Sequence, residues 1–457
     1  MSFISLFIIT LVTWLTLVFL SVADGIEKGW IQRLTSIHGP LKVIPTEEYY
    51  ASHYNKIDLY SHASKYTQKS LKEKRFSNVL TAFNPEIDEE LPEDFPSPIV
   101  DREGQPVDVV KKLFSCIETL SSEFPKVKGE EYEITGAMMR LKIFSPKTQG
   151  FNLISQASYI MSIDPISASL LPDPVEQKTS HTPIFLPKSF EESGAKIHDV
   201  GQLTIYNGMS MGSVEENNLF EVVGFYNAGT LQIGPKCLFA PYSFVSELAH
   251  QGQMESIDPI LSSGIRLHID PISSTPLLAK RMEQLLEKEG LSPYFQIVPY
   301  YEYSFVKDIL TSFQSDRLLY SFVALLVLIV AASNIVSVLL LIVYQSRRDI
   351  ALFTALGASK KSLVRIYAGL GFLLGSLGSF FGLILASATM ANMPFIMHNI
   401  QILKGYENLF SQSIPTSLSP AALLVVLVGT PIIALIAGLI PAIKASRYKP
   451  SELLRLI

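Results

Sequence analysis

The sequence predicts an α-helical membrane protein with four transmembrane helices and a large exported α+β domain between the first and second helices. Four apolar stretches are each long enough to cross about 30 Å of hydrocarbon, which takes about 20 helical residues. A long polar segment separates the first stretch from the other three. The predicted segments are a transmembrane helix (1–23), an exported domain (24–317), a second transmembrane helix (318–344), a cytoplasmic coupling segment (345–362), a third helix (363–390), an exported loop (391–421), a fourth helix (422–443) and a cytoplasmic tail (444–457).

The first apolar stretch, Phe3–Val22, has an alternative interpretation as a signal peptide. Ser21-Val22-Ala23 would satisfy the small-residue cleavage rule. The stretch lacks a basic n-region, however, and it is longer than the usual apolar core of about 7–15 residues. We therefore interpret it as a retained membrane helix.

Charge predicts which side of the membrane each segment faces. The segment after the second span and the C-terminal tail carry eight Lys and Arg residues between them, whereas the loop between the third and fourth spans carries only Lys404. Because positive residues stay cytoplasmic, the tail is expected inside and residues 24–317 outside. The exported segment holds 27 Lys and Arg against 39 Asp and Glu, a net charge of −12. This acidity argues against nucleic acid as a partner.

The exported segment is expected to be mixed α/β. Gly264–Ile269 alternates as a strand, Thr275-Pro276 begins a helix, and Gly290 ends that helix before a strand near Phe295–Val298. A second helix is predicted at Val107–Leu120.

The predicted strand Tyr132–Phe144 follows the second helix, Val107–Leu120, and we expect the two to form one layer. Phe151–Ile163 and Ile184–Phe239 then supply a strand-rich outer lobe.

Cys116 and Cys237 are the two cysteines. A domain of this size does not need a disulfide, so their pairing stays open.

The membrane-spanning segments lack ionisable groups. Residues 318–344, 366–390 and 421–443 contain no Asp, Glu, Lys, Arg or His. Ion-coupled and proton-coupled transporters keep such groups at mid-membrane, so the composition argues against a secondary transporter.

A stripe of small residues follows one face of the third span at helical spacing. Its glycines are Gly371, Gly375, Gly378 and Gly382. Such a face lets another helix backbone approach closely, and we expect it to support assembly with a partner permease. The alternative is that Gly is simply common in membrane helices. Asn334, inside the second span, is interpreted as a polar contact between helices.

A short amphipathic segment lies between the second and third spans. Ile350, Phe353 and Leu356 fall at i, i+3 and i+6 and form one apolar edge of a short helix, which Gly357 can end. Arg348 and Asp349 precede this edge. The segment is expected either to lie on the lipid surface or to contact a cytoplasmic partner.

Several short motifs are distributed over nearly the whole chain. They are Ser2-Phe3-Ile4-Ser5-Leu6, Asp24-Gly25-Ile26-Glu27-Lys28, Phe220-Glu221-Val222-Val223-Gly224-Phe225, Ala332-Ser333-Asn334-Ile335-Val336-Ser337, Arg347-Arg348-Asp349-Ile350-Ala351-Leu352, Ala355-Leu356-Gly357-Ala358-Ser359 and Pro441-Ala442-Ile443-Lys444-Ala445-Ser446-Arg447 before Pro450. In this order they resemble the LolC/LolE-type permeases of the lipoprotein-releasing ABC transporter, within the MacB/FtsX-like mechanotransmission superfamily.

The resemblance implies a permease subunit of the bacterial inner membrane with a MacB-like periplasmic core domain. It would use a LolD-like cytoplasmic ATPase to extract lipoproteins, together with a second permease copy in a homodimer or heterodimer. The released lipoprotein would pass to a LolA-like periplasmic carrier. No Walker A pattern occurs in the sequence, so we expect no ATP site, no cofactor and no enzymatic activity of this chain's own.

The segment Asn207–Asn218 is predicted to be a long hairpin tip. In LolC-like members a protruding hairpin at this place docks the chaperone, which makes Gly208, Met209, Met211, Glu215 and Glu216 candidate docking residues. The same tip contains a G-x-S-x-G pattern. A hydrolase elbow must connect a strand to a helix, whereas this segment lies between two predicted strands, so we expect no catalytic residue. The His and Cys residues show no metal-ligand spacing either.

Two other functions stay open. A MacB- or FtsX-like permease could serve another periplasmic substrate or regulate a cell-wall hydrolase. A membrane-anchored sensor or interaction protein without transport is the alternative of a different class. The cytoplasmic segment argues against the sensor, and the extent of the motif match favours lipoprotein release.

Overall fold

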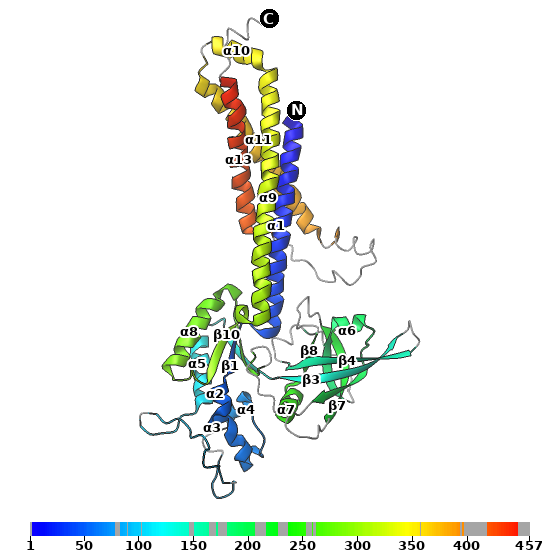
Figure 1. Ribbon diagram of the computed structural model, residues 1–457, viewed down its shortest axis with the longest axis vertical. Coiled ribbons are helices and arrows are strands. Elements are labelled where there is room, and N and C mark those ends of the chain that lie inside the picture. Colours follow the sequence, from blue (N-terminus) through cyan, green and yellow to red (C-terminus); the bar gives the residue numbers. More distant parts are fainter. Residues whose placement is uncertain are drawn as a thin grey trace. The chain divides into compact units, whose positions relative to one another are not determined.

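A computed structural model gives the architecture of the chain (Figure 1). It forms two compact units, one of Met1–Gly29 with Ile309–Ile457 and one of Trp30–Asp308. We call them the membrane unit and the insert domain. The described residues are 2–77, 83–88, 90–101, 103–145, 150–163, 171, 181–205, 216–226, 236–252, 258, 262–356, 358–393, 395–396 and 418–446.

Four helices of the described chain are long and apolar enough to cross a membrane, as the sequence predicts. They are α1 (Ser2–His38), α9 (Ser304–Gln345), α11 (Lys360–Ala391) and α13 (Pro420–Ser446). A short helix, α10 (Arg347–Ala355), connects α9 to α11. The predicted boundaries at Asp24 and Arg317 fall inside α1 and α9, both of which are continuous. Within the membrane unit these two helices run side by side (Figure 1), and Phe19 packs edge to face on Tyr320.

The small-residue stripe of α11 packs against helices of the same chain. A Cβ added at Gly371 would lie 2.6 Å from the carbonyl oxygen of Ala434, and one at Gly375 would lie 2.5 Å from the Cβ of Ala434. These two glycines therefore admit the backbone of α13, because no larger residue leaves it room.

The next two glycines of the stripe face α1. A Cβ added at Gly378 would lie 2.5 Å from Cγ2 of Ile9, and one at Gly382 would overlap the side chain of Thr13. Thr13 also donates a hydrogen bond to the carbonyl oxygen of Gly378 at 3.1 Å. The expectation that the stripe serves a partner permease needs correction, since contacts within the chain already occupy all four glycines.

Polar contacts add to this packing. The hydroxyl of Ser5 on α1 donates to Oδ1 of Asn334 on α9 at 3.4 Å. Trp14 Nε1 donates to the hydroxyl of Thr389 on α11 at 2.9 Å. Because hydrocarbon offers no water to such groups, each bond favours one register of the two helices.

The insert domain contains a four-stranded sheet in the order β10-β1-β9-β2. The strands are β1 (Leu41–Pro45), β2 (Lys128–Tyr132), β9 (Gly264–His268) and β10 (Phe295–Pro299), and all neighbouring pairs are antiparallel. The helices α5 (Val109–Glu123) and α8 (Thr275–Lys288) share one apolar core with the sheet. The predicted strand–helix–strand unit is confirmed as β9-α8-β10, with β1 inserted between the two strands.

The second part of the insert domain is a closed barrel in the order β3-β4-β8-β5-β7-β6. Its core is a cluster of buried apolar side chains that includes Met139, Ile160 and Phe220. The strands are β3 (Ile134–Ser145), β4 (Gly150–Ser162), β5 (Thr182–Pro187), β6 (Val200–Ile205), β7 (Glu216–Tyr226) and β8 (Cys237–Ala240).

One prediction about these layers is wrong. The segment Tyr132–Phe144 is not a single strand in the layer of α5, because the chain leaves the sheet after Tyr132 and enters the barrel at Ile134. Glu133 marks the change, and its backbone N–H donates to the hydroxyl of Ser162 on β4 at 2.9 Å.

The described part of the insert domain also contains short helices. They are α2 (Glu47–Ala51), α3 (His53–Lys56), α4 (Leu71–Phe76), α6 (Lys188–Glu192) and α7 (Tyr242–Gly252), with 3-10 turns at Ile57–Tyr60, His62–Ser64, Ile272–Ser274 and Tyr300–Glu302.

Cys116 and Cys237 are both free and buried. Cys116 lies on α5 in the core of the sheet, whereas Cys237 begins β8 of the barrel. Burial raises the pKa of the Cys116 thiol to about 11 and that of Cys237 to about 12. Both thiols are therefore protonated and unreactive at neutral pH.

A buried ion pair fixes the segment that precedes α5. Lys74 Nζ lies 3.0 Å from Oδ2 of Asp58, and the two side chains are 0% and 3% exposed. The same ammonium donates to the carbonyl oxygen of Tyr54 at 2.6 Å, and Ser64 donates to the other carboxylate oxygen at 2.9 Å. Such a pair is costly to break because the remaining charge stays buried.

We expect Gly375→Leu to destabilise the membrane unit, because the new side chain must displace the backbone of α13. Overpacking of this kind costs roughly 1–3 kcal/mol or more. Gly369→Leu on the same helix is the matched control, since a Cβ there meets nothing within 4 Å. The measurement is the thermal midpoint of the detergent-purified chain; equal midpoints for the two variants would contradict close packing at Gly375.

Lys74→Met should lower the free energy of unfolding of the insert domain by roughly 3–5 kcal/mol, because Asp58 is left charged and buried. Arg281→Met removes the exposed partner of Glu123 and should cost less than about 1 kcal/mol. Urea unfolding of the full chain in detergent measures both. A smaller loss for Lys74→Met than for Arg281→Met would show that the buried pair adds nothing.

Candidate functional site

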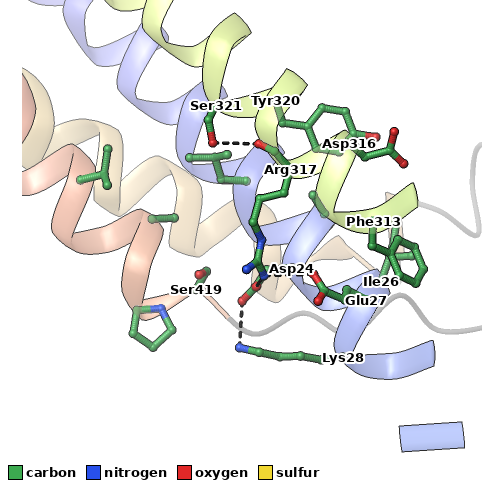
Figure 2. Close-up of a pocket in the computed structure, with 15 residues that line it drawn as sticks. Asp24, Ile26, Glu27, Lys28, Phe313, Asp316, Arg317, Tyr320, Ser321 and Ser419 are labelled. Atoms are coloured by element: carbon green, nitrogen blue, oxygen red, sulfur yellow. Dashed lines mark hydrogen bonds and ion pairs between the residues drawn. The ribbon is translucent and has the colours of Figure 1, made fainter. Parts of the chain in front are cut away.

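A pocket lies in the membrane unit where α1, α9 and the first turns of α13 meet. Its volume is about 590 Å³, within the range of about 300–1,000 Å³ that is usual for ligand sites. Figure 2 shows the lining side chains. The apolar ones are Leu20, Ala23, Ile26, Phe313, Tyr320, Pro420, Ala422 and Val425, and the polar ones are Asp24, Glu27, Lys28, Asp316, Arg317, Ser321 and Ser419.

The charged lining residues lie near the predicted ends of two spans. Asp24, Glu27 and Lys28 of α1 and Asp316 and Arg317 of α9 fall just outside the predicted spans 1–23 and 318–344. Leu20 and Val425 lie inside their spans. The pocket therefore has an apolar wall on the membrane side and a charged rim at the predicted membrane boundary.

Arg317 of α9 is the centre of the charged rim. Its Nη2 lies 2.8 Å from Oδ1 of Asp24 and 3.0 Å from Oε2 of Glu27, both on α1. Lys28 approaches the other oxygen of Asp24 at 2.8 Å, one helical turn further on. Figure 2 shows Asp24 between these two cations. The rim thus ties α1 to α9 beside the pocket.

The start of α13 joins the same rim. The backbone N–H of Ser419 donates to the hydroxyl of Ser21 on α1 at 3.3 Å. Ala422 and Val426 then pack against Leu17 of α1 and Ala386 of α11. Three helices consequently define the pocket, and a change in their spacing would change its width.

The chemistry of the pocket suits an amphipathic molecule. Apolar side chains can hold hydrocarbon, while carboxylates, an ammonium and a guanidinium at the rim can pair with a polar or zwitterionic head. Within the described part of the chain, no three His, Cys, Asp or Glu side chains lie close enough together to hold a metal ion.

The predicted coupling helix is present as α10, but its exposed edge differs from the expected one. Ile350 is only 3% exposed and packs against Val343, Leu363, Tyr367 and Ala442. Those four residues belong to α9, α11 and α13, so Ile350 fixes α10 to three transmembrane helices. It is not free for a cytoplasmic partner.

Among the described side chains of α10 and the residue after it, Leu352 and Leu356 are the large apolar ones that are exposed, at 57% and 77%. Arg348 and Asp349 are exposed beside them. Arg348, Leu352 and Leu356 follow one another at intervals of four residues, so they share a helix face. The backbone of Phe353 lies in α10; its side chain and Gly357 lie outside the described residues.

The candidate docking hairpin is described only at its base. β6 and β7 pair antiparallel from Ile205 opposite Glu216 to Val200 opposite Glu221, which confirms a hairpin. Gly208, Met209, Met211 and Glu215 lie outside the described residues, as does the side chain of Glu216.

The sequence does not predict the pocket. Asp24 belongs to a family motif and Arg317 ends the predicted exported segment, but the sequence predicts neither as part of a site, and it does not predict Leu352 on the apolar edge of the coupling helix. Charged residues next to the ends of the first two spans are the available signal, but pairing Arg317 with Asp24 requires knowing that α1 and α9 are neighbours.

Comparison with known proteins agrees with this architecture. Residues 321–450 match the family described as FtsX-like permease C-terminal. The lipoprotein-releasing system transmembrane protein LolE of Haemophilus influenzae is 31% identical over 134 residues, which cover 28% of this chain and 32% of LolE. LolC of the same organism is 24% identical over 217 residues, covering 47% of this chain and 50% of LolC. LolC of Xylella fastidiosa is 25% identical over 153 residues, covering 32% of this chain and 37% of that protein.

The matched stretches thus span between about a third and a half of the relatives' length. Together with the four apolar helices, these relatives identify the chain as a multi-pass protein of the inner membrane. The resemblance suggested by the sequence motifs is confirmed: the chain carries an FtsX-like permease domain and is similar to the LolC and LolE permeases.

Proposed function

We propose that this chain is the permease subunit of an ABC transporter that takes lipoproteins out of the inner membrane and passes them to a periplasmic carrier. The observation that carries the proposal is the pocket between α1, α9 and α13. It combines an apolar wall with a charged rim, whose charges lie on α1 and α9 at the ends of the first two predicted spans. A lipidated polypeptide has the matching chemistry, with acyl chains for the wall and a polar backbone for the rim.

The similarity to LolC and LolE supports lipoprotein as the substrate class, since both relatives are named as parts of a lipoprotein-releasing system. In this proposal the insert domain is exported, in keeping with its net charge of −12 and the positive residues on the opposite side. A LolA-like carrier would receive the lipoprotein there, with the β6–β7 hairpin as its docking element.

Energy would come from a separate LolD-like ATPase, because the sequence lacks a Walker A pattern. The contact would be the exposed face of α10 with Leu352 and Leu356. Because Ile350 packs on α9, α11 and α13, a push on α10 would move the cytoplasmic ends of three helices together. A second permease copy would complete the membrane assembly.

Filling the pocket should block release of a lipoprotein. Val425→Trp places a large ring against the pocket wall, because Val425 lines it and is 49% exposed. The measurement is ATP-driven release of a lipidated protein from proteoliposomes that contain the chain, its partner permease and the ATPase. We expect at least a tenfold loss of release with ATP hydrolysis retained.

Ile436→Trp is the matched control for this experiment. Ile436 lies on the same helix and is 55% exposed, but it lines no part of the pocket. Normal release by Val425→Trp would exclude the pocket as the lipid site. Release of a soluble protein with no lipid anchor would instead favour a MacB-like permease with another substrate.

Coupling to the ATPase should depend on the exposed leucines of the α10 segment. Leu356→Glu places a charge in the proposed apolar contact, and central contacts of this kind are worth about 2 kcal/mol or more. We expect loss of both ATPase co-purification and lipoprotein release, with the insert domain still folded. Lys361→Met, at an exposed position on α11, should behave as the wild type. Wild-type release by Leu356→Glu would exclude this face of α10 as the contact with the ATPase.

A further inference from the structure

The four-stranded sheet of the insert domain ends in an edge strand. β2 is the last strand in the order β10-β1-β9-β2, and it pairs with β9 from Lys128 opposite His268 to Tyr132 opposite Gly264. Within the described part of the chain, β2 exchanges backbone hydrogen bonds with β9 alone. Lys128 and Gly129 are exposed, so this end of the strand is open to solvent. An open edge can take up a further strand through its free N–H and C=O groups.

A groove lies beside this edge, between β2 and helix α5. Its volume is about 340 Å³, within the range of about 300–1,000 Å³ that is usual for ligand sites. Its lining includes Gly129 of β2, Ile265 of β9, Arg75 of α4, and Phe114, Ile117 and Glu118 of α5. A strand edge next to a helix groove is the arrangement that PDZ domains use to bind an extended peptide.

Gly129 brings the groove close to the backbone of the strand. A Cβ there would lie 2.8 Å from Cγ2 of Ile117, so a larger residue would push α5 away. This contact identifies the face of β2 that α5 covers. Glu131 lies on the same face, because strand residues two apart share a face. An added strand would likewise place every second side chain on this face, next to Phe114 and Ile117.

One guanidinium contacts two carboxylates at the groove. Arg75 Nη2 lies 3.1 Å from Oε1 of Glu118, and its Nη1 lies 3.4 Å from Oε1 of Glu131. The ring of Phe114, 4.5 Å from Arg75 Cζ, supports the guanidinium from below. Glu131 is only 12% exposed, and its Oε2 has no hydrogen-bond partner among the described residues. Glu118 is 69% exposed and can pair with a second cation while it keeps Arg75.

The protonation of Glu131 agrees with this imbalance. Burial raises the pKa of the Glu131 carboxyl above its ordinary value, although the charge of Arg75 lowers it. A second cation beside the carboxylate would therefore be stabilised. The net charge of −12 for residues 24–317 also favours the approach of a basic segment.

We propose that the edge of β2 and this groove bind an extended, basic segment of another protein, which adds to the sheet as a fifth strand. The main chain of the segment would bond to β2. A Lys or Arg opposite Glu131 would form a cross-strand ion pair and reach Glu118, and an apolar side chain opposite Gly129 would contact the groove. These two positions are two residues apart, so the segment has a basic and an apolar residue separated by one residue.

A second copy of this chain is a poor occupant of the same edge. Its own β2 carries Glu130 and Glu131, so pairing β2 with β2 would bring carboxylates together. The charge of the groove instead favours a partner whose strand is basic.

Selection from a phage-displayed library of random nonapeptides tests the site on the purified full chain in nanodiscs. Neither ATPase nor lipoprotein is present, so the result does not depend on the proposed function. Ser121→Trp fills the groove, because Ser121 lines it and is half-buried. Ser115→Trp is the matched control, since Ser115 is exposed on the same helix and does not line the groove. We expect peptides that are enriched about tenfold on the wild type and on Ser115→Trp relative to Ser121→Trp.

The selected peptides should carry Lys or Arg two positions from an apolar residue. In fluorescence anisotropy, Glu118→Lys should weaken a synthetic peptide of the selected sequence about tenfold, whereas Thr119→Lys, at an exposed position outside the groove, should not. N-methylation tests the added strand directly. Methylation of one alternate set of peptide amides should abolish binding, and methylation of the other set should be tolerated, because only one set faces β2.

Three results would overturn the proposal. They are a library in which no peptide separates the wild type from Ser121→Trp, selected peptides without the basic residue, and equal binding by both N-methylated peptides. A change in oligomeric state caused by Ser121→Trp but not by Ser115→Trp would assign the edge to a second copy and would also overturn it.

Discussion

Close approach of helix backbones at small residues is the constraint on which the membrane unit depends. Between lipid-facing helices there is no hydrophobic driving force, so shape and a few polar contacts decide the arrangement. Gly371 and Gly375 admit α13, while Gly378 and Gly382 admit α1. One helix, α11, therefore positions two others.

That arrangement brings the functional features to the two ends of the unit. At one end, α1, α9 and α13 meet around the pocket, with Arg317 paired to Asp24 and Glu27. At the other end, Ile350 of α10 packs into the ends of α9, α11 and α13. Two of the helices that line the pocket, α9 and α13, therefore also pack against α10.

The insert domain depends on buried polar groups as well as on its apolar cores. The Lys74–Asp58 pair is compensated by hydrogen bonds from Ser64 and to Tyr54. Lys42 and Arg266 are also buried, and both lie against the ring of Tyr132. The first arrangement stabilises the segment before α5, and the second lies where α1 enters the sheet.

The sequence by itself determined the four apolar helices, the mixed α/β insert, the β9-α8-β10 unit and the resemblance to LolC and LolE permeases, because hydropathy, turn residues and local motifs are properties of short segments. Tertiary structure decided what depends on neighbours distant along the chain. It brought Arg317 to Asp24, turned Ile350 inward, and filled the face of Gly375 with α13. It also moved the strand after Tyr132 from the sheet into the barrel, since one alternating pattern fits either.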